Sequence, residues 1–415
     1  MPKSNTATRP TVSFLLSADY YHWERDGALS TGALLKTASS VDDVRTQMDA
    51  YVGWVSRVQQ ETDPHGQSVL AEPKYMIPNG TVYAGGWCRP QNDGPGLRSG
   101  TLIAYASALA QEELQGKNLT MTGGKYTSAD LWKYIQIDLD WQAANWEANG
   151  CDLWEEIRSN DFFWNRYTIR AALTNGAAFA KTQGDATRAS TYSNAATAVS
   201  ATLESHYNGA FVQECDARKK DAAVICAFND GYLGDGVFGP SSKEVAGTVQ
   251  TLNALFCDSY AINQADTKNG IPGILYGRYE GDHYAGGNPW ILLTSALAEL
   301  LYRGASEMYN SAEGVYDNVN MEDMQAWADA LGLDTTSENA IALDGHVLAT
   351  AMAGAGDGVL TRLRSHVSNT QFHLTEQIDR NSGTPMAAHD LTWSYATTLK
   401  AIHARSEYKG LSAKN

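Results

Sequence analysis

The sequence predicts an all-α protein, and two features of the chain carry that prediction. Segments with apolar residues at helical spacing recur along its 415 residues, many of them rich in alanine, whereas strand signals are scarce. Polar loops rich in arginine, aspartate, tyrosine and tryptophan separate these segments. Such alternation is typical of a barrel of helix pairs whose loops converge on a pocket. Neither a Pro/Ser linker nor a low-complexity segment interrupts the chain, which favours a single domain.

The positions of the helices follow from the spacing of their apolar residues. Two helices are predicted between Gly27 and Gln59, and the second has Val44, Met48 and Val52 on one face. Further helices are predicted over residues 97–115, 128–148, 161–183, 186–206, 243–264, 289–308, 319–331, 340–366 and 387–405. Residues 60–96 are predicted to be a long loop, and a loop of this length within a compact domain is usually functional.

The composition narrows the class of function. A net charge of −16 argues against a nucleic-acid partner, because phosphate contacts need concentrated lysine and arginine. The 11 tryptophans and 21 tyrosines exceed what a core needs and suit a pocket that stacks on sugar rings or other flat ligands. No stretch is long and apolar enough to span a bilayer, so no membrane partner is expected. The start of the chain lacks the pattern of a signal peptide.

The five cysteines decide little by themselves. They are Cys88, Cys151, Cys215, Cys226 and Cys257, with no C-x-x-C pair and no metal-ligand spacing. An odd number leaves at least one of them unpaired. The last three lie close enough in sequence for one local disulfide, a pairing that the spacing leaves open. No metal site is predicted.

The stretch over residues 141–163 holds the strongest candidate for chemistry. Asn149-Gly150 is predicted to end one helix and Asn160-Asp161 to cap the next, which places Glu155 and Glu156 on the connection between them. A carboxylate beside an indole is partly desolvated, which raises its pKa and can keep it protonated as a general acid. The alternative interpretation is an ordinary solvated helix end.

Hydrolysis of a glycosidic bond fits these parts. That reaction needs two carboxylates on opposite faces of a sugar ring, together with aromatic platforms and charged side chains for the sugar hydroxyls. Glu155 or Glu156 is a candidate for one carboxylate, and Glu376 or Asp379 in the last polar loop for the other. For Glu376 alone, a solvated loop acid is the alternative.

Five blocks of polar and aromatic sequence occur in order between Asp19 and about Arg405. They are DYYHWERD, LAEPKYMIPNGTVYAGGWCRPQNDGPGLR, GCDLWEEIRSNDFF, GRYEGDHYAGGNPW and TEQIDRNSGTPMAAHDLTWSYA. Each block is modestly specific, but five in order are improbable by coincidence. Together they closely resemble the fungal-type glucoamylases of glycoside hydrolase family 15, and this resemblance implies an (α/α)6 barrel.

The resemblance also implies roles for individual residues. Glu155 matches the family's general acid and Glu376 its general base. Arg25 and Asp26 match groups that bind hydroxyls of the terminal glucose, and Glu156 matches a contact to the next sugar. The whole set that matches the sugar-binding pocket is Tyr20, Trp23, Arg25, Asp26, Trp87, Asp152, Trp154, Glu156, Arg278, Trp290, Gln377 and Trp393. Tyr21 is the alternative to Tyr20, because the first block is one residue shorter than the family pattern.

Three features depart from that pattern. Ala387 stands where the family has a serine whose hydroxyl bonds the base, so the ionised form of Glu376 lacks one donor. Residues 1–18 form a short N-terminal extension, so the family's first helix is expected to be missing and the barrel to be less stable. The catalytic domain is predicted over residues 19–415, with no starch-binding domain after it.

The resemblance implies an exo-acting, inverting hydrolase that releases β-D-glucose from the non-reducing ends of α-1,4-glucans such as starch and maltooligosaccharides. The alternatives are activity on α-1,6-glucan, isomaltose or trehalose, or a carbohydrate-binding pseudoenzyme. No cofactor is implied, because two carboxylates and a water suffice for the inverting reaction. The implied partner is the α-glucan substrate, and the family pattern implies an extracellular monomer.

Overall fold

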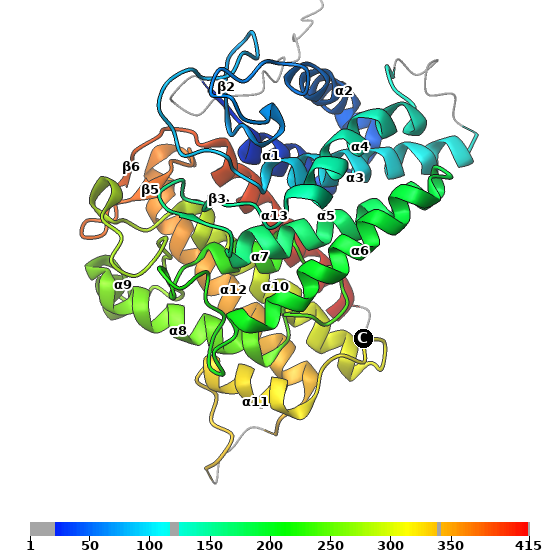
Figure 1. The fold of residues 1–415 in the computed structure, drawn as a ribbon. Coiled ribbons are helices and arrows are strands. Elements are labelled where there is room, and N and C mark those ends of the chain that lie inside the picture. Colours follow the sequence, from blue (N-terminus) through cyan, green and yellow to red (C-terminus); the bar gives the residue numbers. More distant parts are fainter. Residues whose placement is uncertain (1–20, 117–123, 338–341, 414–415) are drawn as a thin grey trace, which may run out of the picture.

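The computed structural model describes residues 21–116, 124–337 and 342–413, and most of its regular structure is helical (Figure 1). The α-helices in these ranges are α1 (Glu24–Thr37), α2 (Val41–Val58), α3 (Gly94–Leu114), α4 (Ser128–Asn145), α5 (Phe163–Thr182), α6 (Ala186–Leu203), α7 (Ala223–Asp230), α8 (Lys243–Ser259), α9 (Ala261–Lys268), α10 (Ile291–Ala312), α11 (Met321–Ala330), α12 (Gly345–Val367) and α13 (Thr392–Ser412). The strands are β1 (Tyr21–Trp23), β2 (Lys74–Met76), β3 (Gly150–Cys151), β4 (Arg158–Ser159), β5 (Gln377–Ile378) and β6 (Pro385–Met386). The prediction of an all-α protein is confirmed.

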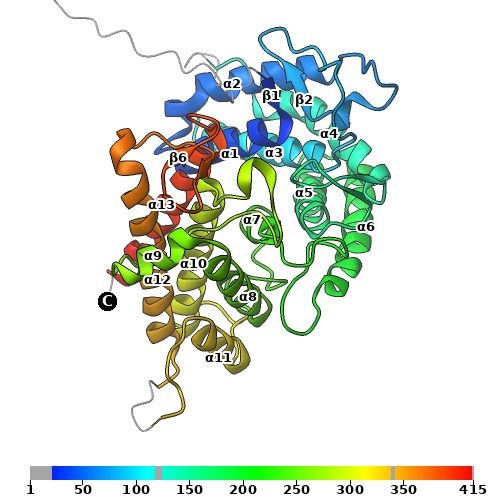
Figure 2. The same cartoon turned by 90° about the vertical axis from the view of Figure 1, so that its left-hand side faces the viewer.

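Six helices form a closed inner ring. They are α1, α3, α5, α7, α10 and α13; each packs against the next, and α13 packs back against α1. An outer layer covers the ring, in which α2 packs on α1 and α3, α4 on α3 and α5, α6 on α5, and α12 on α10. Figure 2 shows the first and last inner helices, blue α1 and red α13, beside each other. This arrangement is the predicted (α/α)6 barrel.

The burial of each helix reflects its layer. The inner helix α10 packs against α7, α12 and α13, and it is buried along the continuous run over residues 291–302. Such a helix has no exposed face and therefore no clear amphipathic period. The outer helix α2 instead buries one side, through Val44, Met48, Val52 and Val55.

A network of charges around the buried carboxylate of Glu299 joins four inner helices. Lys400 Nζ of α13 lies 2.5 Å from an oxygen of Asp230 in α7 and 3.4 Å from an oxygen of Glu299 in α10. Lys36 of α1 lies 3.8 Å from the same carboxylate of Glu299. Although burial opposes it, the neighbouring lysines hold the pKa of Glu299 below its usual range. Replacing the buried Lys400 would take the nearer cation from the buried carboxylate of Glu299, and breaking a buried pair typically costs roughly 3–5 kcal/mol.

Several helix predictions are wrong in detail. The helix predicted over residues 243–264 is two helices, because Tyr260 has an extended backbone (φ −120°, ψ 112°) between α8 and α9. Asn160-Asp161 does not cap α5; the residue in the N-cap position is Phe162, and Asp161 pairs with Arg166 at 2.9 Å. The short helix α7 was not predicted, since its eight residues are almost all buried and show no period.

The boundaries of the last two helices also differ from the prediction. Helix α12 begins at Gly345, where the carboxylate of Asp344 accepts hydrogen bonds from the first turn. Helix α13 begins at Thr392 rather than at residue 387, because Ala387 and Asp390 have positive φ angles of 64° and 61°. The predicted extension over residues 1–18 and the predicted lack of a first helix lie outside the described residues and stay predictions.

Candidate active site

Three antiparallel strand pairs hold the segments that carry the predicted site. Strands β1 and β2 pair Trp23 with Lys74, and β3 and β4 close the turn over residues 152–157. Strands β5 and β6 form the hairpin that follows Glu376. A further bridge between Trp290 and Gln377 joins the start of α10 to this hairpin. Segments far apart in the sequence, such as those of Trp290 and Gln377, are thereby joined by main-chain pairing.

The turn that carries Glu155 is built around the carboxylate of Asp152. This buried carboxylate accepts hydrogen bonds from the backbone N–H groups of Glu156 at 2.7 Å, Ile157 at 2.8 Å and Trp154 at 3.2 Å. Glu155 itself has a positive φ of 66°, an uncommon conformation for a residue with a side chain. Strain of this kind costs on the order of 1–3 kcal/mol and persists only where neighbouring contacts enforce it. Asp152 therefore fixes the shape of the turn.

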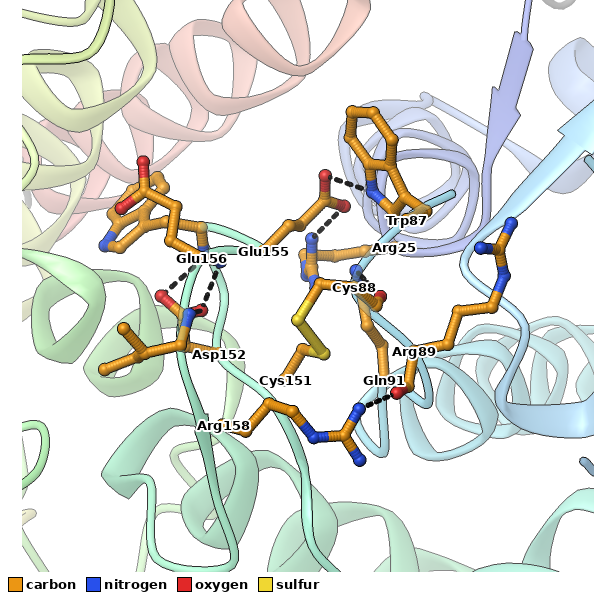
Figure 3. The surroundings of a disulfide bond; sticks show 12 residues. Arg25, Trp87, Cys88, Arg89, Gln91, Cys151, Asp152, Glu155, Glu156 and Arg158 are labelled. Carbon is orange, nitrogen blue, oxygen red and sulfur yellow. Dashed lines mark hydrogen bonds and ion pairs between the residues drawn. A yellow bond between two sulfur atoms is a disulfide. The ribbon is translucent and has the colours of Figure 1, made fainter. Parts of the chain in front are cut away.

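The side chain of Glu155 faces an indole and a buried guanidinium (Figure 3). Trp87 Nε1 donates to Glu155 Oε2 at 2.9 Å, and Arg25 Nη1 lies 3.7 Å from Glu155 Oε1. Arg25 is held in turn by Asp93 and Gln91, each at 2.6 Å. Burial raises the pKa of Glu155, while Arg25, Gln91 and Trp87 oppose that rise. Burial thus favours the protonated form of the Glu155 carboxyl. The N–H groups of Trp87 and Arg25 lie where they can stabilise the carboxylate once the proton has left.

Asp26 lies within electrostatic range of both predicted catalytic carboxylates. Burial raises its pKa to about 7; the charge of Arg25 lowers it, and the charges of Glu155 and Glu376 raise it further. Negative charges close to one another raise the pKa of each carboxyl, and a carboxyl with such a raised pKa is typical of a functional cleft. Asp26 therefore couples electrostatically to both Glu155 and Glu376.

Glu156 points away from its neighbour Glu155 and joins a different cluster (Figure 3). Arg278 Nη2 lies 2.9 Å from Glu156 Oε1, and the hydroxyl of Tyr279 donates to Oε2 at 2.5 Å. Arg218 also pairs with this carboxylate. Asp282 fixes Arg278 through two bonds of 2.6 and 2.9 Å. The geometry thus separates the side chains of the two adjacent glutamates.

Two tryptophans stand beside this cluster. The rings of Trp154 and Trp290 are 5.9 Å apart, and the guanidinium of Arg278 lies 5.5 Å from each ring centroid. Trp154 Nε1 donates to Asp221 at 2.8 Å, which fixes the indole. Burial raises the pKa of Asp221 to about 7. The predicted residues of these two loops are therefore brought together.

Glu376 lies directly before β5, held by bonds on both sides of its backbone. Its N–H donates to the carbonyl of Ala388 at 2.8 Å, and its own carbonyl accepts from Ile291 at 3.1 Å. Gln377 Nε2 donates to Glu376 Oε2 at 3.0 Å, and Asn288 fixes the amide oxygen of Gln377 at 3.0 Å. Gln377 thus positions the carboxylate that the resemblance assigns as the base.

Ala387 lies opposite Glu376 in a local bulge of the hairpin. The register pairs Gln377 with Met386, so the next pair would be Glu376 with Ala387. The N–H of Glu376 bonds instead to Ala388, and Ala387 has a φ of 64°. One extra residue on one strand is the signature of a β-bulge, which re-aims side chains beside functional sites.

Two further predicted residues lie near this hairpin. Asp379, the other candidate for the base, directs its carboxylate into its own turn, where it accepts from the N–H and hydroxyl of Ser382 at 2.7 and 2.9 Å. Trp393 is buried at the start of α13, where the hydroxyl of Ser394 donates to the carbonyl of Thr375 at 2.9 Å. These contacts tie the last inner helix to the segment that carries Glu376.

Lys74 is a member of the site to which the sequence analysis gave no role. Its ammonium lies 4.5 Å from the ring centroid of Trp23 and 3.9 Å from that of Trp87, with Tyr21 at 4.0 Å and Tyr83 at 4.3 Å. The side chain is buried, so these cation–π contacts act without water between them. The four rings form an aromatic cage around the ammonium. Tyr20 lies outside the described residues.

The cysteines pair differently from the local disulfide that the spacing left open. Cys88 and Cys151 form a disulfide, whereas Cys215, Cys226 and Cys257 are free. The pair was missed because 63 residues separate its members and only the tertiary fold brings them together. The bond lies between Trp87 and the turn over residues 152–157 that carries Glu155, the acid turn (Figure 3).

One group of side chains near the last polar loop could supply ligands to a metal ion. Among the described residues, His373, His389 and Asp390 place their ligand atoms within 4.8 Å of one another. Each histidine is already hydrogen-bonded to Asp390, at 2.7 and 2.9 Å. Throughout the described ranges, every helix is too short or too polar to cross a membrane.

The barrel fold is shared with solved structures. The glucoamylase from Saccharomycopsis fibuligera superposes with a TM-score of 0.81 at 24% identity, covering 94% of this chain and 87% of that one. The glycoside hydrolase family 15 glucoamylase from Hypocrea jecorina gives a TM-score of 0.78 at 28% identity, covering 94% and 65%. The fold class is therefore that of the (α/α)6 barrel enzymes to which these structures belong.

Sequence comparison gives the family. The family described as glycosyl hydrolases family 15 matches residues 1–403, and the chain belongs to it. A glucoamylase from Blastobotrys adeninivorans is 31% identical over 94% of this chain, and glucoamylase 1 from Rhizopus oryzae is 32% identical over 93%. The chain spans 66% and 64% of the lengths of these two relatives.

Proposed function

We propose that this protein is a glucan 1,4-α-glucosidase that acts on the non-reducing ends of α-1,4-glucans with inversion and releases β-D-glucose. The observation that carries the proposal is the environment of Glu155. Its carboxyl has a raised pKa and faces Trp87 and Arg25, while Asp26 couples electrostatically to both Glu155 and Glu376. The glucoamylases among its relatives support the α-glucan as substrate.

In the proposed reaction, Glu155 gives its proton to the glycosidic oxygen as the bond to the sugar breaks. The carboxylate left behind is stabilised by the indole N–H of Trp87 and the guanidinium of Arg25. Glu376 takes a proton from the attacking water, which approaches from the opposite face of the ring. Gln377 holds the carboxylate of Glu376 in place for this step.

The surrounding residues are assigned to sugar binding in the same proposal. Arg25 and Asp26 bind hydroxyls of the terminal glucose. The indoles of Trp23 and Trp87, two rings of the aromatic cage around the Lys74 ammonium, offer flat surfaces to the sugar. On the other side of the acid turn, Glu156 and its partners contact the next sugar. We further infer an extracellular monomer, following the family pattern.

The deciding experiment measures glucose release from maltose and soluble starch by the wild type and by Glu155→Gln. The amide keeps the shape of the side chain but has no labile proton, so turnover should fall by on the order of 10² to 10⁴ or more while maltose still binds. Glu147→Gln, on the exposed segment before the acid turn, is the matched control and should retain activity.

A panel with isomaltose and trehalose in the same assay separates neighbouring linkage specificities. Binding of maltose without turnover by the wild type would instead support a carbohydrate-binding pseudoenzyme. Near-normal turnover by Glu155→Gln would overturn the assignment of the acid.

A further inference from the structure

The Cys88–Cys151 disulfide joins the two segments that create the environment of Glu155. Cys88 directly follows Trp87 in the loop between β2 and α3, and Cys151 directly precedes Asp152, whose carboxylate organises the acid turn. The crosslink therefore ties the donor of the hydrogen bond to the turn that carries its acceptor (Figure 3).

The other contacts between these segments lie on one side of the disulfide. Cys151 N–H donates to the carbonyl of Pro90 at 2.8 Å, and Asn92 Nδ2 donates to the carbonyl of Ala148 at 2.6 Å. The side chain of Arg158 donates to the carbonyl of Arg89. All three contacts use residues that follow Cys88 in the chain. Trp87 precedes it, so the disulfide is the covalent anchor next to the indole.

Besides the disulfide, side chains restrain this loop: Arg89 donates to the carbonyls of Tyr83 and Gly85 at 2.7 and 3.0 Å, and the Lys74 ammonium contacts the indole of Trp87. Gly85 and Gly86 precede the indole, no helix or strand includes residues 86–91, and Trp87 is 41% exposed. Glycine has the largest backbone freedom of any residue, so holding the indole in one place costs conformational entropy. A crosslink at the next residue removes much of that freedom.

From this geometry we propose that Cys88 and Cys151 are positioning residues for the general acid. Their disulfide holds Trp87 Nε1 against the carboxylate of Glu155, so it affects the reaction and not only the stability of the fold. This inference rests on the proposed function, in which Glu155 gives up its proton.

The first test is the double variant Cys88→Ala/Cys151→Ala, with Cys257→Ala as the matched control at an exposed free cysteine. Loosening the indole should lower kcat on maltose on the order of tenfold, about 1.4 kcal/mol of barrier, with a smaller change in KM. The basic limb of the kcat/KM profile should move to higher pH. Because the disulfide acts through Trp87, adding Trp87→Phe to the double variant should produce no further shift.

A second arm uses the wild type and a dithiol reductant. The dithiol becomes its cyclic disulfide, and Cys88 and Cys151 each gain one electron and one proton as the bond between their sulfurs breaks. The reduced wild type should match the double variant, and the double variant should not respond to the dithiol. If the double variant does not fold, the comparison of the reduced with the oxidised wild type provides the test.

Acrylamide quenching of the Trp87 fluorescence, obtained as the difference from Trp87→Phe, tests the position of the indole without any turnover. Quenching should increase when the disulfide is absent. A lower melting temperature with unchanged quenching, kcat and pH profile would show that the bond only stabilises the fold. A wild type that binds maltose without hydrolysing it would overturn the proposed function but leave the quenching result valid.

Discussion

Glu155 and Glu156 are adjacent in the chain, yet their carboxylates lie in different clusters, one beside Trp87 and Arg25 and the other beside Arg278 and Tyr279. Glu155 has a positive φ of 66°, and its side chain leaves the turn in a different direction from that of Glu156 (Figure 3). The same substitution at the two positions should therefore have different kinetic effects.

We predict that Glu156→Gln raises KM for maltooligosaccharides by about tenfold with a smaller change in kcat, as expected when an interaction of about 1.4 kcal/mol made equally in ground and transition states is lost. The amide can still accept from Tyr279 but no longer balances the charge of Arg278. Steady-state kinetics beside Glu155→Gln provide the measurement. Loss of kcat in Glu156→Gln with retention in Glu155→Gln would exchange the two roles.

We predict that Trp87→Phe moves the basic limb of the pH profile to higher pH. The indole N–H stabilises the ionised form of Glu155, so its removal raises the pKa of that carboxyl, and a general acid is active only below its pKa. A hydrogen bond of roughly 0.5–1.5 kcal/mol corresponds to a shift of up to about one pH unit. Trp132→Phe on α4 is the control. A basic limb that stays in place would mean that the indole does not bond the acid.

We predict that Ala387→Ser moves the acidic limb to lower pH by up to about one unit, because a serine hydroxyl opposite Glu376 can donate to its ionised form. Serine and alanine both carry a Cβ, so the substitution adds little strain at this positive φ. Ala388→Ser, one residue further on, is the matched control. Equal profiles for wild type and Ala387→Ser would place the hydroxyl out of reach of the base.

We predict that Asp221→Asn weakens the pH dependence of stability between about pH 4 and 7. Burial raises the pKa of Asp221 to about 7, so the folded protein holds this proton at pH values where the unfolded chain releases it. Stability from this group is thus lost as pH rises, by about 1.4 kcal/mol per unit, up to the folded pKa. Urea unfolding of wild type, Asp221→Asn and the exposed control Asp216→Asn measures the slope. Parallel slopes would show that Asp221 titrates normally.

We predict that the first product released from an α-linked substrate is the β-anomer of glucose. Inversion needs a gap of about 6.5–9.5 Å between the two carboxyls, wide enough for a water. Glu155 and Glu376 lie on separate loops, joined to different strand pairs. Proton NMR in the first minutes, before mutarotation, identifies the anomer. Initial α-glucose would contradict the role of Glu376 as a base.

A helix can be predicted from its sequence where one face meets solvent and leaves an amphipathic period. The period of α2, with Val44 and Met48 on one side, is an example. The inner helix α7 lacks that signal, since nearly all of its residues are buried. The break at Tyr260 was also missed, because nothing local in the sequence forbids a helix there.

For the site, the resemblance named residues that the fold brings together, but it did not give their mutual contacts. The positive φ of Glu155 and the bulge at Ala387 are backbone features that the sequence does not indicate, because neither position holds a glycine. The aromatic cage of Lys74 and the Cys88–Cys151 bond depend on segments far apart in the chain. Local patterns carry no information on such pairs.

The contact between α1 and α13 has a consequence for how the protein reaches its native state. Arg25 lies on the first inner helix and Trp393 on the last, so the proposed site is incomplete until α13 has left the ribosome and docked. Pairings between such distant segments slow folding, and the uncovered inner helices expose apolar surface meanwhile. Premature termination within α13 should therefore yield an aggregation-prone chain rather than a partly active one, and chaperone demand should peak late in synthesis.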